Sequence, residues 1–349
     1  MKTVTREKRG GKKARHFEVN EETSIEKVKM SELLSNTQTK SSLVTLIMNY
    51  CRLNILGKNY IIAGDSKTYS SFGNLPTSNN HEAADTLMIH CLCIAPIEES
   101  DQVLVYANDT DVFVLLLKHF EKFPSKNVYM KGNGMIDISH VHLTLGQDVS
   151  SSILSLHALT GCDITVKFAG KSKEFWTNLF IDQKENENLI SALLSFQHHI
   201  TDDTSIELER FVCSGYISKK TEKSKIDNLT SARYFLFTKY QGENDKLPPT
   251  SGAFTKHIKR AFYQLSIWAE ASESIINHRN PADYGWSLSE DVMTPETTDV
   301  EIAPKAIIEL ISCKCKNNCS SRRCKCKRNN ISCTDFCGCN DCENTDVKP

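Results

Sequence analysis

The sequence predicts an α/β fold in which a mainly parallel sheet is flanked by helices, followed by a helical extension and a small cysteine-rich module. Two observations lead to this prediction. Strand-like and helix-like segments alternate at short spacing over residues 41–173, which is typical of a parallel sheet whose strands are joined by helices. Nine of the fourteen cysteines fall within the last 37 residues, while the other five are scattered.

Length and composition exclude several classes of protein. With 349 residues, the chain is long enough for about two domains and a small appendage. The longest apolar run, Val112 to Leu117, is far shorter than the roughly 18 residues that a membrane helix needs. The start is basic and polar, and the sequence holds no GxSxG, P-loop or GxGxxG motif. We therefore expect an intracellular protein that is not a serine hydrolase, a nucleoside triphosphatase or a dinucleotide enzyme.

Charge is distributed unevenly along the chain. Residues 1–15 carry seven Lys or Arg and one Glu, and residues 313–349 carry eight Lys or Arg and four acids. Residues 16–312 hold 27 bases and 38 acids. Basic ends beside an acidic body indicate contact with a polyanion at the ends, although runs of charge are more often simply solvated.

The N-terminal part of the chain begins with an arm. Residues 1–40 are basic and polar and lack hydrophobic periodicity, so we expect them to be exposed. An amphipathic pattern predicts a helix over 42–56, and KNYIIAG predicts a short buried strand over 58–64. Residues 66–80 are polar and rich in turn formers, which predicts a loop.

Alternating strands and helices follow. HEAADTLMIHCLCIA (81–95) predicts a helix with acids in its first turn, and QVLVYA (102–107) predicts a buried strand. VFVLLLKHF (112–120) predicts a helix, NVYMKG (127–132) a strand, and SSILSLHAL (151–159) a helix that leads into TGCD.

Beyond the α/β domain, helical periodicity over 174–275 predicts a helical extension. Residues 276–312 include three prolines and predict a linker to a cysteine-rich module at 313–344.

The cysteine-rich module has the spacing C-x-C-x3-C-x4-C-x-C-x6-C-x3-C-x-C-x2-C. Thiolates are soft ligands suited to tetrahedral Zn²⁺, which binds four of them. Nine cysteines do not divide into closed four-cysteine sites, but they satisfy about three zinc ions if three of them each bridge two ions. The predicted ligands are Cys313, Cys315, Cys319, Cys324, Cys326, Cys333, Cys337, Cys339 and Cys342.

Basic residues are interleaved with these cysteines. Two interpretations are open: the basic side chains neutralise the excess charge of the thiolates, or they also bind nucleic acid by displacing counterions from phosphates. The candidate nucleic-acid-binding residues are Lys314, Lys316, Arg322, Arg323, Lys325, Lys327 and Arg328.

The spacing of the nine cysteines, down to the ending Cys342-Glu343-Asn344, resembles the CXC module of tesmin-type proteins. The resemblance implies a trinuclear zinc cluster, DNA binding and a nuclear location. In much of that family a Tyr precedes the fourth cysteine and reaches into the minor groove, whereas this chain has Arg323. An Arg also enters narrow minor grooves, but a base preference that depends on the Tyr is not implied.

Acidic residues stand where α/β enzymes place their chemistry. Asp109 and Asp111 follow the strand QVLVYA, at the edge where open α/β sheets bind ligands. Asp163 lies in TGCD, and Glu82 and Asp85 begin the helix over 81–95. Carboxylates from several loops suit Mg²⁺ or Mn²⁺, and such ions activate water for phosphodiester hydrolysis. The alternative is that these acids are helix caps and turn formers.

The order of these acids resembles the ExE, DxD and GxD motifs of flap-endonuclease and PIN-like nucleases. More closely, HEAADT, YANDTDVFVLLL, HALTGCDITVKFAGKSK, ELERFVC, LPPTSGAFTKHIKRA and DYGW resemble a large group of uncharacterised invertebrate proteins that are often mobile-element-derived and often end in a CXC module. The likeness spans Thr5 to Asn344. It implies a PIN-like fold over 41–173 with a metal-dependent endonuclease site at Glu82, Asp85, Asp109, Asp111 and Asp163. It also implies phosphate contacts by Lys171 and Lys173, for which a solvated loop is the alternative.

Two departures affect the implied activity. The group usually has Glu at the position of Ala83, and Glu82 points about 100° away around the helix. The segment TREKRG resembles one that lies, in the group, after a first strand with another catalytic Asp, so the nuclease-like domain looks N-terminally truncated. We therefore expect a nuclease-like fold with an incomplete set of carboxylates.

Three functions are consistent with these patterns. The first is a nuclear, mobile-element-derived zinc protein that binds nucleic acid, with DNA as the expected partner, beside a nuclease-like body. The second is an active, structure-specific endonuclease that depends on Mg²⁺ or Mn²⁺. The third is a zinc-stapled protein-interaction module without affinity for nucleic acid.

Overall fold

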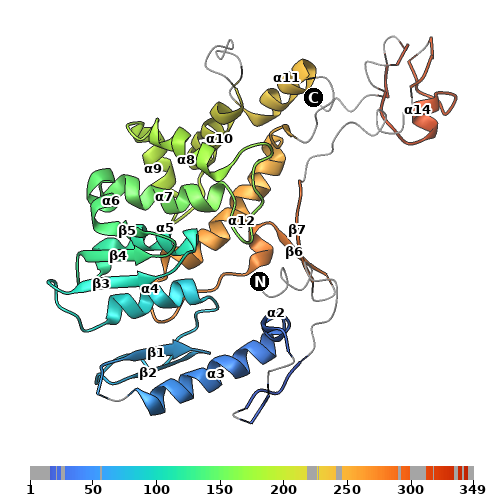
Figure 1. Ribbon diagram of the computed structural model, residues 1–349. Helices are drawn as coiled ribbons and strands as arrows, with labels where there is room; N and C mark the ends of the chain where they lie inside the picture. Colours follow the sequence, from blue (N-terminus) through green and yellow to red (C-terminus); the bar gives the residue numbers. More distant parts are fainter. Residues whose placement is uncertain are drawn as a thin grey trace. The chain divides into compact units, whose positions relative to one another are not determined.

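The protein forms two compact units, Met1–Thr297 and Thr298–Pro349 (Figure 1). The computed structural model describes residues 16–20, 22–24, 28–55, 57–217, 226, 228–240, 246–289, 292–298, 312–316, 318–333, 337–339 and 342–344. Residues 1–15 of the predicted arm and 299–311 of the predicted linker lie outside these ranges. No helix in the described part is both long and apolar enough to cross a membrane.

The first unit begins with two helices and a hairpin. They are α2 (Met30–Leu33), α3 (Thr37–Asn54), β1 (Ile61–Gly64) and β2 (Lys67–Ser70). The helix predicted over 42–56 is therefore confirmed as part of α3, but the loop predicted over 66–80 begins with a strand. The reason is a tight turn: Asp65 and Ser66 have φ values of 46° and 62°, a left-handed conformation that lets two residues join antiparallel strands.

The next elements confirm the predicted alternation of helix and strand. They are α4 (Ala84–Ile94), β3 (Gln102–Tyr106), α5 (Thr110–His119), the 3₁₀ turn η1 (Phe120–Lys122) and β4 (Asn127–Lys131). β3 and β4 pair in parallel, with α5 as the connection between them. This is the one βαβ unit among the described residues, because no other described pair of strands is parallel.

The sheet that contains β3 and β4 is small and mixed rather than mainly parallel. Its strand order is β3-β4-β5, and β5 (Met135–Asp137) runs antiparallel to β4. The connection from β4 to β5 is a short turn in which the Gly132 N–H donates to the Gly134 carbonyl oxygen over 2.9 Å. A turn of this length can join only antiparallel strands, since a parallel pair needs a crossover of about a dozen residues.

Helices dominate the rest of the first unit, as predicted. They are α6 (Ile138–Leu145), α7 (Gln147–Leu159), α8 (Lys173–Ile181), α9 (Glu187–Ser195), α10 (Asp202–Tyr216), α11 (Leu229–Tyr240) and α12 (Ser251–Ala269). Six of these helices begin after a side chain that accepts a hydrogen bond from the backbone N–H three residues later. These N-caps, which satisfy otherwise unpaired donors, are Asp137, Ser172, Asn186, Thr201, Asn228 and Thr250.

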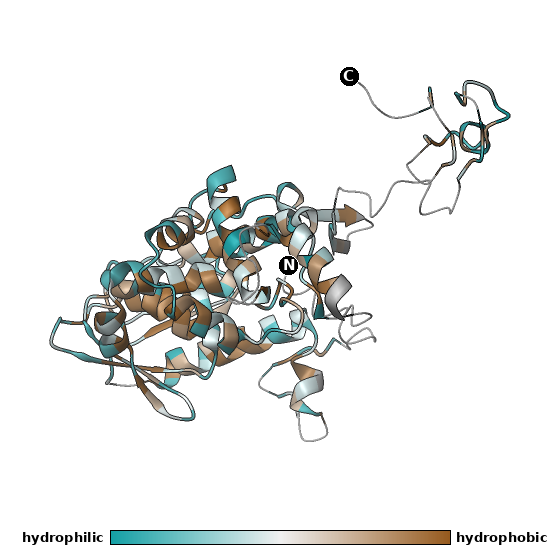
Figure 2. Cartoon of the chain, turned by 90° about the horizontal axis from the view of Figure 1, so that it is seen from above, coloured by the Kyte–Doolittle hydropathy of each residue, from teal (hydrophilic) through white to brown (hydrophobic). Residues whose placement is uncertain are grey.

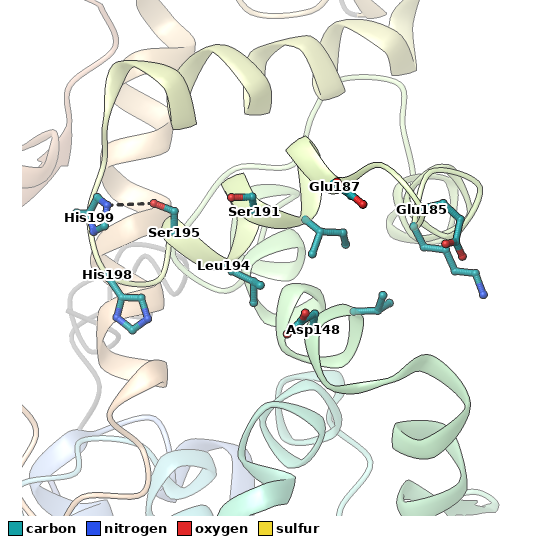
Figure 3. A pocket seen from close by; sticks show the side chains of 11 residues that line it. Asp148, Glu185, Glu187, Ser191, Leu194, Ser195, His198 and His199 are labelled. Atoms are coloured by element: carbon teal, nitrogen blue, oxygen red, sulfur yellow. Dashed lines mark hydrogen bonds between the residues drawn. The ribbon is translucent and has the colours of Figure 1, made fainter.

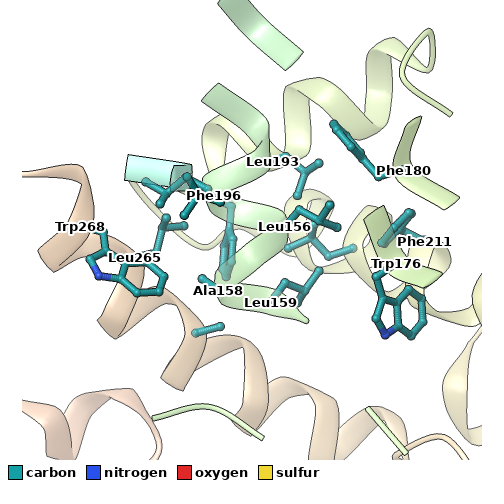
Figure 4. Packing of buried hydrophobic residues seen from close by; sticks show 14 of the residues in the cluster. Leu156, Ala158, Leu159, Trp176, Phe180, Leu193, Phe196, Phe211, Leu265 and Trp268 are labelled. Carbon is teal, nitrogen blue, oxygen red and sulfur yellow. The ribbon is translucent and has the colours of Figure 1, made fainter. Parts of the chain in front are cut away.

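One hydrophobic core runs through the first unit. Its buried members extend from Ile89 on α4 to Ala271 after α12, so the predicted α/β domain and helical extension share a single core across residue 173. Figure 4 shows Leu156 and Leu159 of α7 between Trp176 on one side and Trp268 on the other. Hydrophobic residues gather in the helices and strands at the centre of this unit (Figure 2).

A hairpin completes the first unit. The 3₁₀ turn η4 (Pro281–Tyr284) leads into β6 (Trp286–Ser289) and β7 (Val292–Pro295), which pair antiparallel. The Arg260 side chain on α12 donates to the Glu296 carbonyl oxygen over 2.6 Å, and the Lys256 Nζ lies 2.6 Å from the Glu296 carboxylate. Part of the segment predicted as a linker, 276–312, thus packs on α12.

Candidate metal centre and acidic site

The second unit is built around its nine cysteines. Five of them are buried, and the other four pack against these as half-buried side chains. Among the described residues, this cluster contains no other apolar side chain. Its one described helix, α14 (Lys325–Arg328), is a single turn. A crosslink or a metal ion would stabilise a small module whose described part has no larger apolar core.

The spacing of the sulfur atoms fits zinc. The Sγ of Cys313 lies 3.8 Å from that of Cys319 and 3.9 Å from that of Cys333. The Cys326 and Cys337 sulfurs are 3.6 Å apart. Zn–S bonds of about 2.3 Å in a tetrahedron place neighbouring sulfurs about 3.8 Å apart. These distances are too long for disulfides, and none joins the cysteines.

Sets of cysteines overlap in this cluster. Among the described residues, three sets of four have all their sulfur atoms within 4.8 Å of one another. The sets are Cys313, Cys315, Cys319 and Cys324; Cys313, Cys319, Cys333 and Cys339; and Cys313, Cys324, Cys326 and Cys333. Cys313 belongs to all three sets, and Cys319, Cys324 and Cys333 each belong to two, so the geometry is that of one fused cluster rather than of separate sites.

Hydrogen bonds from the backbone and from the Asn344 side chain hold the ends of the module together. The Gly338 N–H donates to the Cys313 carbonyl oxygen over 2.9 Å. The Asn344 amide donates to the Ile331 carbonyl oxygen over 2.9 Å and lies 3.4 Å from the Cys333 sulfur. The Asn344 side chain is thus placed to stabilise a thiolate at Cys333, because an N–H donor favours the charged form.

Most of the predicted basic residues of this module are exposed. Lys327 is the exception: it is half-buried and its Nζ donates to the Ser320 carbonyl oxygen over 2.6 Å. The exposed basic residues are Lys314, Lys316, Arg322, Arg323, Lys325 and Arg328. Exposed cations at this density on a small module are typical of a surface that binds a polyanion. Lys327 instead stabilises the loop before α14 through its hydrogen bond to Ser320.

The predicted carboxylates lie in different settings in the first unit. Asp109 is exposed and caps α5 by accepting a hydrogen bond from the Asp111 N–H over 2.9 Å. Asp111 is buried, and its Oδ1 lies 2.8 Å from the Nε2 of His157 on α7. Burial lowers the pKa of His157, although its hydrogen bond to Asp111 acts in the opposite direction. A neutral His157 therefore donates its Nε2–H to the carboxylate.

Sequence reasoning missed His157. The residue lies inside the motif HALTGCD, six residues before Asp163, and its partner is 46 residues away in the chain. The signal that could have indicated it is a histidine on a largely apolar helix, just before a loop with a candidate acid.

Lys173 belongs to the same region. Its Nζ donates to the carbonyl oxygens of His157, over 2.6 Å, and of Gly161, and to the Thr160 hydroxyl over 3.1 Å. These contacts use all three donors of the ammonium group. Burial lowers its pKa to about 8. Lys171, by contrast, lies over the ring of Phe175 at 4.1 Å. Lys173 thus fastens the TGC turn to α7.

The remaining predicted acids lie in three different settings. Glu82 and Ala83 line a cavity of about 30 Å³ together with Tyr263 and Trp268. Asp85 is half-buried in the first turn of α4, and Asp163 is exposed. Within the described residues, every group of three or more close potential ligands consists of cysteines. The five carboxylates do not form such a group.

A larger hollow of about 740 Å³ lies elsewhere, at α9 and the start of α7. Figure 3 shows side chains of its lining, including Asp148 and His198, and the hydrogen bond between the His199 ring nitrogen and the Ser195 hydroxyl, which are 3.1 Å apart. None of the predicted site residues lines this hollow.

Comparisons of the chain with protein-family models, with curated proteins and with solved structures find no match. The residues and their geometry therefore carry the functional inference.

Proposed function

We propose that the chain is a nuclear zinc protein that binds nucleic acid, with DNA as the partner, through the cysteine-rich module at 313–344. We further propose that it derives from a mobile element and that its first unit is nuclease-like in fold but cleaves poorly or not at all. The single observation that carries the zinc assignment is the overlap of three four-cysteine sets in one cluster.

The proposal includes a ligand assignment for three zinc ions. The proposed ligand sets are Cys313, Cys315, Cys319 and Cys324; Cys319, Cys333, Cys339 and Cys342; and Cys324, Cys326, Cys333 and Cys337. Cys319, Cys324 and Cys333, which each lie in two of the overlapping sets, then bridge two ions each. Every other cysteine binds one ion, including Cys313, which lies in all three sets. Two observations support the members outside the overlapping sets. Cys337 lies 3.6 Å from Cys326, and the Cys342 thiol interacts with those of Cys333, Cys339 and Cys319.

Charge supports a nucleic-acid partner. Nine thiolates exceed the charge of three dications, so part of the basic charge offsets the cluster. Six basic side chains of the module are nonetheless exposed, whereas the half-buried Lys327 donates to the Ser320 carbonyl oxygen. Such side chains bind phosphates and release counterions, which makes binding strong and sensitive to salt.

The state of the carboxylates supports weak or absent cleavage. Asp111 is held by His157, and the five acids do not gather around one point within the described residues. Ala83 lines the cavity at the start of α4, where the resembling group has a Glu. Metal-dependent hydrolysis requires ligands that converge on the ions, so the absence of a close carboxylate group among the described residues supports the proposal.

A binding experiment tests the nucleic-acid proposal. Zinc-loaded protein is titrated into a fluorescent DNA duplex of about 20 base pairs at several salt concentrations. The Arg322→Ala/Arg323→Ala variant should weaken binding and reduce the slope of log K against log salt by about 2, since each phosphate contact contributes about 0.9. A matched control, Lys29→Ala/Lys40→Ala, removes two exposed lysines from the first unit and should leave the slope unchanged. Zinc-loaded protein without salt-sensitive binding would favour the protein-interaction function.

A cleavage assay tests the proposal for the first unit. Zinc-loaded protein is incubated with flap, hairpin and single-stranded substrates in Mg²⁺ or Mn²⁺, beside the Asp109→Asn/Asp111→Asn variant. We expect no cleavage above that variant. Cleavage by the wild type that is lost in the variant would establish an active endonuclease.

A further inference from the structure

β3 lies at one end of the sheet with strand order β3-β4-β5 (Figure 1). The Ala107 N–H donates to the Lys131 carbonyl oxygen over 3.1 Å. In a parallel ladder the backbone N–H and C=O groups of every second residue point to the same neighbouring strand. Those of Val103 and Val105 therefore also point to β4. The N–H and C=O groups of the intervening residues, Gln102, Leu104 and Tyr106, therefore point away from the sheet.

This edge of β3 is open. The described part of the chain offers no hydrogen-bond partner to the backbone of Gln102, Leu104 or Tyr106. Leu104 is 38% exposed and Tyr106 is 68% exposed. The exposed apolar surface continues across the sheet to Met135 on β5, which pairs with Lys131 beside Tyr106.

The strand also lacks the features that protect edges. Its sequence, QVLVY, contains no charged residue, proline or glycine, and its pairing with β4 has no bulge. Natural proteins usually place Lys, Pro or a bulge on an exposed edge, because an unpaired apolar strand is a template for another strand. An unprotected edge of this kind is typical of a strand that pairs with a partner.

We propose that β3 pairs antiparallel with β3 of a second copy of the chain, around a twofold axis at Leu104. The three edge-facing residues are symmetric about Leu104, so antiparallel pairing sets Leu104 opposite Leu104 of the second copy and Gln102 opposite Tyr106. Each opposed pair exchanges two backbone hydrogen bonds, about six in all. The two sheets become continuous, and both open edges are removed.

A second copy fits this edge because β3 is complementary to itself. The pairing is isologous, as in most closed dimers. Two exposed leucines meet at the axis, and each Tyr106 ring lies beside the uncharged Gln102 of the other copy, so neither side buries a charge. Apolar and aromatic cross-strand pairs of this kind stabilise antiparallel strands.

The test is the oligomeric state of the full, zinc-loaded chain, measured by light scattering and sedimentation at about 1–100 µM, since dimerisation depends on concentration. We expect a dimer in the wild type. Leu104→Lys and Leu104→Glu should each give a monomer, because like charges meet at the axis. An equimolar mixture of the two variants should restore a dimer, because opposite charges then meet. Leu143→Lys, which changes a leucine that is 76% exposed on α6, is the matched control and should remain dimeric.

Circular dichroism checks that each variant is folded. If Leu104→Lys is not folded, Tyr106→Lys replaces it, because Tyr106 is the more exposed residue of the same strand. The proposal is overturned if the wild type stays monomeric at the highest concentration, if the charged variants remain dimeric, or if the mixture stays monomeric. Because this readout involves neither zinc nor DNA, it stands or falls separately from the function proposed for the module.

Discussion

The Nε2 of His157 on α7 lies 2.8 Å from the Oδ1 of Asp111 at the start of α5, and both side chains are buried. The pair joins two of the most closely packed helices of the first unit. The backbone of His157 is bound in turn by Lys173, so α5, α7 and the start of α8 are linked through polar contacts inside an apolar core. The acid that resembles a nuclease ligand is thus part of the internal structure.

Removing His157 should destabilise the first unit. His157→Ala removes one hydrogen-bond donor of a buried carboxylate, and a hydrogen bond to a charged group contributes about 1.5–3 kcal/mol to the free energy of unfolding. Urea unfolding followed by tryptophan fluorescence measures the change. His140→Ala, which alters an exposed histidine on α6, should change the free energy of unfolding by less than about 0.5 kcal/mol. An equal effect of both substitutions would show that the His157–Asp111 contact contributes nothing specific.

The first unit should lose stability in acid. Burial lowers the pKa of His119 and of His257 to about 4, from an ordinary value of 6.5. Because these folded-state pKa values are depressed, the unfolded chain binds protons first as pH falls. The free energy of unfolding should therefore decrease between pH 6.5 and about 4, by up to about 1.4 kcal/mol per pH unit for each histidine.

Thermal unfolding between pH 7 and pH 4.5 measures this dependence. The His119→Gln/His257→Gln variant is less stable at neutral pH, because the hydrogen bonds to the Trp268 and Leu159 carbonyl oxygens change. The informative quantity is the slope against pH, which should be shallower than in the wild type. An unchanged slope would mean that other groups cause the acid sensitivity.

Bridging and terminal cysteines should differ in their effect on zinc content. Cys324→Ser removes a ligand proposed to bind two ions, whereas Cys315→Ser removes a ligand of one. Native mass spectrometry should find about three zinc ions in the wild type, and a larger loss for Cys324→Ser than for Cys315→Ser. Cys51→Ser, a change in α3, should keep the full zinc content. Equal losses at positions 315 and 324 would contradict the bridging assignment.

Lys325 and Lys327, two residues apart on α14, should separate DNA affinity from module stability. Lys327 donates to the Ser320 carbonyl oxygen, whereas the Lys325 side chain is exposed. Lys327→Ala should accelerate zinc release to a chelator, and Lys325→Ala should weaken DNA binding with little effect on zinc release. A chelator chase and a DNA titration on both variants provide the comparison, and the opposite pattern would reverse the roles given to these two lysines.

Local patterns were sufficient for the elements that depend on local periodicity. The helices α5 and α7 and the strand β3 were predicted from runs of apolar residues, and the cysteine cluster was predicted from spacing alone. β2 and β5 were missed because they are only four and three residues long and pair with a strand reached through a tight turn. The His157–Asp111 contact was missed because it joins residues 46 positions apart, and no single-sequence pattern encodes such a pairing.

The two units depend on different conditions for folding. Burial of apolar side chains stabilises the first unit, whereas the cluster described in the second consists of thiols, which would gain crosslinks from a bound metal. When zinc is scarce, newly made chains should therefore keep an intact first unit and lack the surface that presents the exposed arginines and lysines. The cellular zinc supply, rather than the amount of protein made, would then set how many copies can occupy DNA.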